Sequence, residues 1–349
     1  MGASVTRGAL ACLAYAYSAG LKVFLFPYRI GIRKQTVLPC PVVSVGNLTV
    51  GGTGKTPMTK LVCQLLAENG LRPCVLSRGY KGQNERGAAV VSTDARIELS
   101  ASEAGDEAYM LARTLPGMPV VVGKDRRKTG TLAWNQFKPD VIVLDDGMQF
   151  YQLHRELDIV LIDALRPFDN GWTFPRGLLR EPPSHLRRAG CIIVTNADKV
   201  SAETTEALSG RIRRLARPAH LTFARYEARA LRPLDGKDDL PISWLSGKKV
   251  ATFCALGRPE AFEKQVADCG AMIVHSMRRL DHSEPTISDL NALISTAQDC
   301  EAEAVIISEK DSVKLPPIAR PLPFLSLQVA LRVDDEDSLR DLLLRAVRE

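Results

Sequence analysis

The sequence predicts an α/β fold, with a doubly wound parallel sheet followed by a second, smaller α/β domain. From residue 40 onward, short apolar runs rich in β-branched residues alternate with longer helical stretches, which indicates parallel strands covered on both faces. Right-handed crossovers then give the doubly wound arrangement. A stretch rich in Pro, Gly and Asp, residues 226–248, interrupts this alternation, which resumes from residue 249. A charged fraction of 25% and a hydrophobic fraction of 45% exclude a disordered or fibrous chain.

The expected elements follow one another within four segments. Residues 1–35 form an N-terminal helix, residues 36–225 the first domain, residues 226–248 a connecting region and residues 249–349 the second domain. In the first domain we expect strands at residues 41–45, 74–77, 120–122, 141–144, 159–162 and 191–195, and helices at residues 56–69 and 103–114. In the second domain we expect strands at residues 250–254, 272–275 and 304–307, helices that begin at Pro259 and Thr286, and a terminal helix at residues 334–347.

The N-terminal segment carries the excess positive charge of the chain. Its residues 8–28 are mostly apolar and aromatic, Arg29, Arg33 and Lys34 follow, and the first acidic residue is Glu68. Seven cations precede Glu68 and the rest of the chain is close to neutral, which argues against a nucleic-acid-binding domain and suits anionic lipid. Because Lys22 lies in the middle of the apolar run, we favour a helix that lies on the membrane. A helix packed on the domain and a membrane-spanning helix are the alternatives.

A glycine-rich loop is the strongest local motif. Residues 42–57 read VVSVGNLTVGGTGKTP, an apolar strand, a glycine-rich turn and the start of a helix. This context predicts a P-loop, in which backbone N–H groups and a helix N-terminus hold phosphate, and hence a P-loop NTPase-type domain. The usual first glycine is replaced by a threonine, and a glycine-rich turn without nucleotide is the alternative. The expected nucleotide-binding residues are Thr49, Val50, Gly51, Gly52, Thr53, Gly54, Lys55 and Thr56.

An acidic pair ends another apolar strand. Residues 141–147 read VIVLDDG, which resembles the element that holds Mg²⁺ in P-loop proteins. We expect Asp145, Asp146 and the hydroxyl of Thr56 to bind the metal, although the two aspartates could equally form a turn or a helix N-cap. The Asn-Lys-x-Asp motif of guanine-specific proteins is missing from residues 195–198. The expected cofactors are therefore ATP and Mg²⁺.

Seven motifs in a fixed order resemble a known family. They are GNLTVGGTGKTP (46–57), SRGYKG (77–82), GDE (105–107), LDDGMQ (144–149), GLLREP (177–182), LDH (280–282) and SEKDSVKL (308–315). Together they resemble the tetraacyldisaccharide 4′-kinase family, the lipid A 4′-kinases. The resemblance implies ATP-dependent phosphorylation of the 4′-hydroxyl of a tetraacylated glucosamine disaccharide 1-phosphate, which forms lipid IVA. It also implies action at the cytoplasmic face of the bacterial inner membrane.

The resemblance also implies roles for individual residues. Asp106 is similar to the general base of the family, His282 to the histidine that pairs with it, and Lys55 and Arg126 to residues that act on phosphate charge. Tyr80, Glu107, Arg180 and Glu181 match positions near the active site or the substrate. Taken alone, each has an ordinary interpretation. GDE is typical of a helix N-terminus, residues 126–128 of a solvated run of charge, and Arg180–Glu181 of a surface ion pair.

Two other functions stay open at this point. A P-loop assembly ATPase or metallochaperone GTPase would share the phosphate loop and the strand-end aspartates, but would act on a protein partner. A small-molecule kinase would act on a soluble sugar or cofactor precursor. The assembly ATPase or metallochaperone GTPase would not need the apolar, basic N-terminal segment. We therefore expect a lipid substrate and peripheral membrane contact, with no nucleic acid and no obligate protein partner. Acyl-chain selectivity, oligomeric state and the choice of metal ligand between Asp145 and Asp146 are open.

Overall fold

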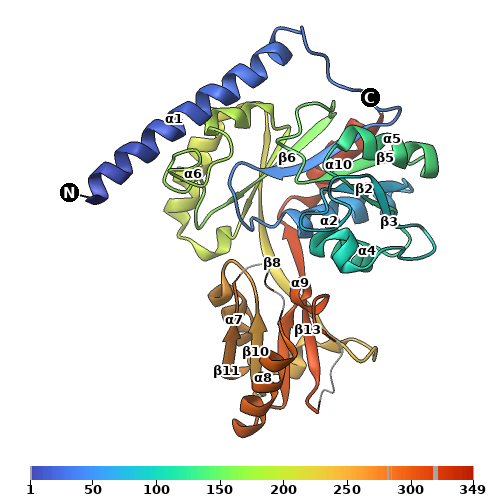
Figure 1. The fold of residues 1–349 in the computed structure, drawn as a ribbon, viewed down its shortest axis with the longest axis vertical. Helices are drawn as coiled ribbons and strands as arrows, with labels where there is room; N and C mark the ends of the chain where they lie inside the picture. The colour runs from blue at the N-terminus through green and yellow to red at the C-terminus, as the bar shows by residue number, and fades with distance from the viewer. Residues whose placement is uncertain (1, 281–282, 284, 317–320, 349) are drawn as a thin grey trace. The chain divides into compact units, whose positions relative to one another are not determined.

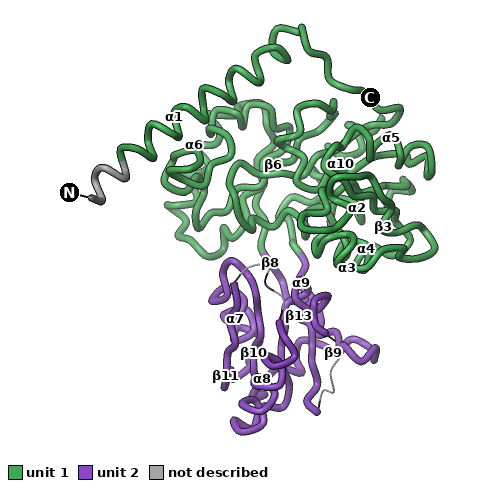
Figure 2. The backbone as a smooth tube through the Cα atoms, viewed as in Figure 1, with its two compact units in different colours: residues 1–225, 331–349 green, residues 226–330 purple. Residues whose placement is uncertain are grey.

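The chain divides into two compact units. A computed structural model describes residues 2–280, 283, 285–316 and 321–348. One unit comprises residues 1–225 and 331–349, and the other comprises residues 226–330 (Figure 2). Residues 331–349, which we expected in the second domain, thus fall in the first unit, where α10 (Glu336–Arg348) contacts α2 and β1. Residues 226–248, expected as a connecting region, belong to the second unit and contain strand and 3-10 helix.

The first unit is built on a mostly parallel sheet of order β8-β7-β6-β1-β5-β2-β4-β3, in which only the edge strand β3 is antiparallel to its neighbour (Figure 1). This confirms the predicted fold class. The strands are β1 (Val42–Asn47), β2 (Pro73–Ser77), β3 (Ala89–Ser92), β4 (Val120–Val122), β5 (Val141–Asp145), β6 (Leu157–Asp163), β7 (Cys191–Thr195) and β8 (His220–Pro233). The helices are α1 (Gly2–Arg29), α2 (Lys55–Glu68), α3 (Ala101–Ala104), α4 (Asp106–Thr114), α5 (Arg126–Phe137), α6 (Ala202–Leu215) and α10, with 3-10 turns η1 (Pro183–Arg188) and η2 (Ala197–Lys199).

Burial on both faces explains why the central strands are continuous apolar runs. Every residue of β1, β5, β6 and β7 is buried. One core cluster joins apolar residues of β6 and β7 to α6, and another joins β2 and β5 to α5. Each fully buried valine or leucine contributes roughly 1.5–3 kcal/mol, so these clusters fix the sheet. The carboxyl ends of β1, β2 and β5 are thereby held at one edge, where the loops of the site begin.

The N-terminal helix α1 is 28 residues long and runs along the outside of the first unit (Figure 1). It ends at Arg29, and Gly31 follows with a φ of 76°, a conformation typical of a helix C-terminus. Only 11% of its most apolar window is buried, and its length and composition would allow it to cross a membrane. Large apolar side chains stay exposed along it: Leu13, Tyr15, Tyr17, Val23, Phe24 and Phe26. The predicted helix is confirmed.

The second unit has its own sheet, of order β11-β10-β12-β13, which continues through the end of β8 to β9. Its elements are β9 (Leu240–Pro241), η3 (Ile242–Leu245), β10 (Lys249–Cys254), α7 (Pro259–Asp268), β11 (Met272–Arg278), α8 (Ile287–Asp299), β12 (Ala304–Ser308), α9 (Glu309–Ser312) and β13 (Phe324–Val333). Two core clusters lie on β10 and β12, one with α7 and one with α8. The three strands and two helices expected at residues 250–307 are confirmed.

Candidate functional site

The phosphate loop connects β1 to α2. Gly51 and Gly54 have φ values of 114° and 91°, which L-residues rarely adopt, so the chain needs glycine at both turns. Inside the loop, the Asn47 amide donates to Thr53 Oγ1 at 2.6 Å, and Lys55 Nζ donates to the Gly51 carbonyl at 3.4 Å. α2 begins at Lys55, so its unpaired N–H groups lie beside the loop. This is the arrangement of an anion site at a helix N-terminus.

A second segment pairs with the phosphate loop. The Val50 N–H donates to the Leu178 carbonyl and the Arg180 N–H to the Leu48 carbonyl, both at 2.7 Å, which brackets an antiparallel bridge between Thr49 and Leu179. Thr49 is not among the residues with positive φ. The glycine usual at this position is therefore not needed, because the residue pairs as extended backbone. The GLLREP segment holds the loop that the sequence predicted to bind nucleotide.

The two aspartates that follow β5 differ in environment. Asp145 is 2% exposed and accepts hydrogen bonds from Thr59 Oγ1 at 3.0 Å and Ser77 Oγ at 3.4 Å. The Asp146 side chain is 33% exposed and receives both terminal nitrogens of Arg180, at 2.8 and 2.9 Å, while Lys55 Nζ lies 4.0 Å away. Asp146 has a φ of 55°, which places it in the left-handed region that few residues other than glycine adopt. Residues held in this region often lie at functional sites.

These environments move the two pKa values apart. Burial, together with Glu107 and Asp146, raises the pKa of Asp145 to about 7. Burial also acts to raise the pKa of Asp146, but Lys55 and Arg180 outweigh it and lower that pKa to about 2. Asp145 is thus the carboxyl group whose pKa is raised, whereas Asp146, beside Lys55 and Arg180, remains a carboxylate.

The donor set fits Mg²⁺ bound with a nucleotide. Among the described residues, no three His, Cys, Asp or Glu side chains are grouped so that they alone could hold a metal ion. Mg²⁺ usually takes only one or two carboxylates and completes its shell with water and substrate phosphates. The hydroxyl of Thr56, in the first turn of α2, and the carboxylates of Asp145 and Asp146 are oxygen ligands of this kind.

The GDE turn lies against the loop that follows β2. Gly105 has a φ of 85° and separates α3 from α4, so that α4 begins at Asp106. A Cβ at Gly105 would come 2.7 Å from the Tyr80 carbonyl, and one at Gly79 would come 2.9 Å from the Ala104 carbonyl. Such close backbone approach needs glycine. It brings Asp106 and Glu107 to the loop that carries Tyr80, whose side chain is 50% exposed.

Arg126 is buried. Taken alone, residues 126–128 indicate a solvated run of charge, and for Arg126 the structure shows otherwise. Arg126 is 4% exposed and is the first residue of α5, which Asp125 caps. Its guanidinium is directed to the end of β5, where it meets the Asp145 carbonyl. It donates to the carbonyls of Gly123 and Asp145, and its buried Nε has no hydrogen-bond partner among the described residues. Burial lowers the pKa of Arg126 to about 10, although the negative charges of Asp145 and Asp146 act to raise it. The side chain remains a cation at neutral pH.

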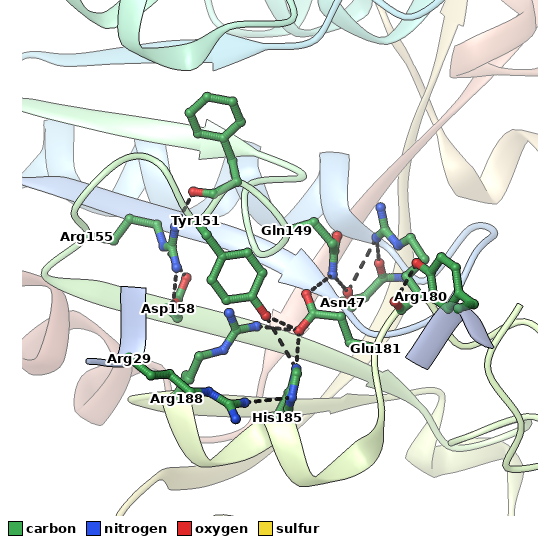
Figure 3. Close-up of polar contacts among 12 residues, drawn as sticks. Arg29, Asn47, Gln149, Tyr151, Arg155, Asp158, Arg180, Glu181, His185 and Arg188 are labelled. Atoms are coloured by element: carbon green, nitrogen blue, oxygen red, sulfur yellow. Dashed lines mark hydrogen bonds and ion pairs between the residues drawn. The ribbon is translucent and has the colours of Figure 1, made fainter. Parts of the chain in front are cut away.

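A buried polar cluster surrounds Glu181 (Figure 3). The carboxylate is 0% exposed and accepts from His185 Nδ1 at 2.7 Å, Arg188 at 2.8 Å, Gln149 at 3.1 Å and the Tyr151 hydroxyl. Its predicted contact with substrate therefore does not fit its position, because protein groups occupy the carboxylate. Burial alone would raise the pKa of Glu181, but the bonds from His185 and Arg188 outweigh it and lower that pKa.

Comparisons with known proteins agree along the whole chain. The family described as tetraacyldisaccharide-1-P 4′-kinase matches residues 6–348. The chain belongs to this family. It is 38% identical to the tetraacyldisaccharide 4′-kinase of Syntrophus aciditrophicus, over 94% of this chain and 93% of that protein. It is 40% identical to that of Anaeromyxobacter dehalogenans, over 88% and 81%.

A solved structure of the family extends the likeness to the fold. The crystal structure of LpxK from Aquifex aeolicus in complex with ATP is 28% identical to this chain, with a TM-score of 0.77. The match covers 98% of this chain and 99% of that one. The predicted family, kinase class and fold are confirmed, and the partner-dependent ATPase or GTPase is not favoured.

In this 4′-kinase, the structure brings some of the predicted site residues together. The structure gathers Lys55, Asp145, Asp146 and Arg180, and it places Glu107 close enough to act on the pKa of Asp145. His282 lies outside the described residues. Sequence reasoning missed Asn47, Gln149, Tyr151, His185 and Arg188, although Asn47 and Gln149 lie within the quoted motifs. The four-residue spacing of Glu181 and His185 is the one signal that could have pointed to their contact.

Proposed function

We propose that this kinase transfers the γ-phosphate of ATP to the 4′-hydroxyl of a tetraacylated glucosamine disaccharide 1-phosphate, which forms lipid IVA. The observation that carries the proposal is the Lys55–Asp146–Arg180 constellation beside the phosphate loop, in a chain matched to the family over residues 6–348. A loop that holds phosphate, next to acidic and basic groups at a strand end, is what phosphoryl transfer requires.

The phosphate loop and Lys55 would hold the β- and γ-phosphates. The backbone of Gly51 is exposed in this loop, and the N-terminus of α2 adds partial positive charge. Lys55 Nζ is held between the Gly51 carbonyl and Asp146, so its position is fixed before nucleotide enters. Arg126 lies behind Asp145 and Asp146, and we assign it the role of balancing their charge from within the protein.

Asp106 is the residue we assign as general base. A sugar hydroxyl is a weak nucleophile, and a positioned carboxylate accepts its proton as the new O–P bond forms and ADP leaves. Asp106 is the first residue of α4, where the Gly105 turn and the loop of Tyr80 fix its backbone. We assign His282 as its partner, and Glu107 as a neighbour that adds negative charge at Asp145.

Thr56, Asp145 and Asp146 would hold Mg²⁺, which supplies positive charge to the phosphate oxygens. Because Asp146 is 33% exposed whereas Asp145 is 2% exposed, we assign the direct contact to Asp146 and the supporting position to Asp145. Tyr80 and Arg180 are partly exposed and suit contact with the substrate. The exposed apolar face of α1 supports peripheral contact with the cytoplasmic face of the inner membrane.

Incubation with radiolabelled ATP and the disaccharide 1-phosphate lipid in detergent micelles tests the proposal. We expect a labelled lipid from the wild-type protein, and none from Lys55→Ala or Asp106→Ala, with unchanged unfolding temperatures. Lys249→Ala, which removes a surface lysine paired with Glu301, is the matched control. An Asp106→Ala enzyme with full kcat would overturn the base assignment. ATP hydrolysis without lipid product would favour an ATPase that acts on a protein partner.

A further inference from the structure

Helix α1 contacts the Arg180–Glu181 segment at two points. The Tyr17 hydroxyl donates to the Arg180 carbonyl at 2.9 Å, and Arg29 Nη2 lies 3.3 Å from His185 Nε2. Figure 3 shows Arg29 and His185 directed toward each other below Glu181. Aromatic contacts accompany them, with Tyr15 against Trp172 at 5.3 Å between ring centroids. The helix that exposes apolar side chains to a membrane is thus also bonded to the segment that supports the phosphate loop.

The two contacts of His185 agree on which nitrogen carries its proton. An arginine can only donate, so Nε2 accepts and is unprotonated. A carboxylate can only accept, so the proton lies on Nδ1, which donates to Glu181 at 2.7 Å. Arg29 and Glu181 therefore favour the same tautomer, and Arg29 holds the ring in the orientation in which Nδ1 bonds Glu181. Without Arg29, Glu181 still favours a proton on Nδ1, but the ring loses one of the two bonds that orient it.

The contacts continue from Glu181 to the phosphate loop. Gln149 Nε2 donates both to Glu181 Oε1 at 3.1 Å and to the Asn47 carbonyl at 2.9 Å. The Asn47 side chain bonds Thr53 inside the loop and also receives Arg180, which in turn holds Asp146. A continuous chain of hydrogen bonds thus joins the C-terminal end of α1 to the groups around Lys55.

We propose that Arg29 and His185 are positioning residues for phosphoryl transfer, and that helix α1 forms part of the framework of the active site. The inference rests on the proposed kinase function. Arg29 fixes His185, His185 fixes Glu181, and Glu181 holds the Gln149–Asn47 pair that supports the loop. A helix that served only as a membrane contact would need cations near its end, but not a particular one on a buried histidine.

Kinetics at saturating ATP and lipid, in detergent micelles, test this role. Arg29→Ala and Arg33→Ala each remove one cation from the same end of the segment, but Arg33 lies over the Tyr28 ring and not on His185. We expect kcat of Arg29→Ala to be about five- to tenfold below that of Arg33→Ala, with similar KM for the lipid. Arg29→Lys, which keeps a donor, should recover part of the loss. Equal kcat for the two alanine variants would overturn the inference.

A double-mutant cycle isolates the pair. His185→Asn keeps a donor near the position of Nδ1 but removes the acceptor for Arg29. If both residues act through one hydrogen bond, the Arg29→Ala/His185→Asn enzyme should be no slower than the slower single variant. If the double variant instead loses kcat by the product of the two single losses, Arg29 and His185 do not act through one hydrogen bond. If the wild-type protein makes no lipid product, the proposed kinase function fails. The contact between Arg29 and His185 is then tested separately by the protonation of the two His185 nitrogens.

The tautomer can be read by ¹⁵N NMR with labelled histidine, because the chain has five histidines. The His185 resonances, assigned by their loss in His185→Asn, should show a protonated Nδ1 and an unprotonated Nε2 in the wild-type and Arg33→Ala proteins. In Arg29→Ala the Nε2 shift should change because that nitrogen loses its hydrogen-bond donor, while Nδ1 stays protonated by its bond to Glu181. A protonated Nε2 in the wild-type protein, or shifts unchanged by Arg29→Ala, would refute the proposed contact.

Discussion

Replacing Glu181 by glutamine should destabilise the first unit strongly, although the two side chains have nearly the same shape. The carboxylate is fully buried and accepts from four donors, one of them the cationic Arg188. Glutamine offers a single acceptor oxygen, and its NH₂ group would face donors that need an acceptor. Breaking a buried ion pair by removal of one partner costs about 3–5 kcal/mol. We expect a loss of about 3 kcal/mol, because the amide oxygen keeps part of the bonds.

Thermal and urea unfolding of the wild-type and Glu181→Gln proteins measure this loss. For a unit of this size, about 3 kcal/mol corresponds to a drop in Tm of roughly 6–12 °C. Glu301→Gln is the matched control, because Glu301 is 79% exposed and solvent screens its pair with Lys249. A Glu181→Gln protein as stable as this control would refute the reasoning.

The pH dependence of stability provides an independent check on the same residue. The pKa of Glu181 is lowered below its ordinary value of 4.5, because the bonds from His185 and Arg188 outweigh the effect of burial. A group with a depressed folded pKa stabilises the protein fully above its unfolded pKa, and this contribution is lost as pH falls through the folded value. The difference in stability between wild type and Glu181→Gln should thus be complete above pH 4.5 and narrow below it. If the stability difference between wild type and Glu181→Gln stays the same at acidic pH, the ionised Glu181 carboxylate is not its source.

Three further changes test other parts of the site. Gly46→Ala would place a Cβ 2.5 Å from Met148 Cβ, so we expect a loss of about 1–3 kcal/mol by urea unfolding, and an unchanged midpoint would contradict the packing. Arg126→Met should lower kcat at least about tenfold, because it removes a buried cation beside Asp145 and Asp146; full activity would exclude its charge role. Deletion of residues 1–34 should reduce sedimentation with anionic vesicles at low salt more than it reduces ATP binding, and full sedimentation would exclude anchoring by this segment.

The sequence predicted the parts of the fold that are uniform along the chain. β1 and β5 are apolar and buried at every position, so composition alone marks them as central parallel strands. β8 was missed because most of its residues are only partly buried and three arginines interrupt its apolar positions. α5 was missed because it begins with Arg126 and two more cations, a pattern typical of a solvated surface. The helix forms there because Asp125 caps its N-terminus and receives the Arg127 N–H.

The site divides in the same way, between local motifs and contacts across the sheet. The phosphate loop and the Asp145–Asp146 pair are written in consecutive residues, so their chemistry could be inferred from spacing. The Glu181 cluster draws on Asn47, Gln149 and the η1 turn, which are more than 100 residues apart at the extremes. No local pattern encodes which of several polar residues will meet at one buried carboxylate. Only the order of strands β6, β1 and β5 brings them together.

The N-terminal basicity combines distinct structural roles. Two of the seven cations that precede Glu68 lie in or just after the phosphate loop, and Lys55 is one of them. At the other end, Arg33 lies over the Tyr28 ring, while Arg29 contacts His185 in the cluster beside that loop. A charge excess that served lipid binding alone could be redistributed along the helix without effect. The contact of Arg29 ties its position to the interior of the kinase domain, so the identity of this residue should matter to turnover even where no membrane is present.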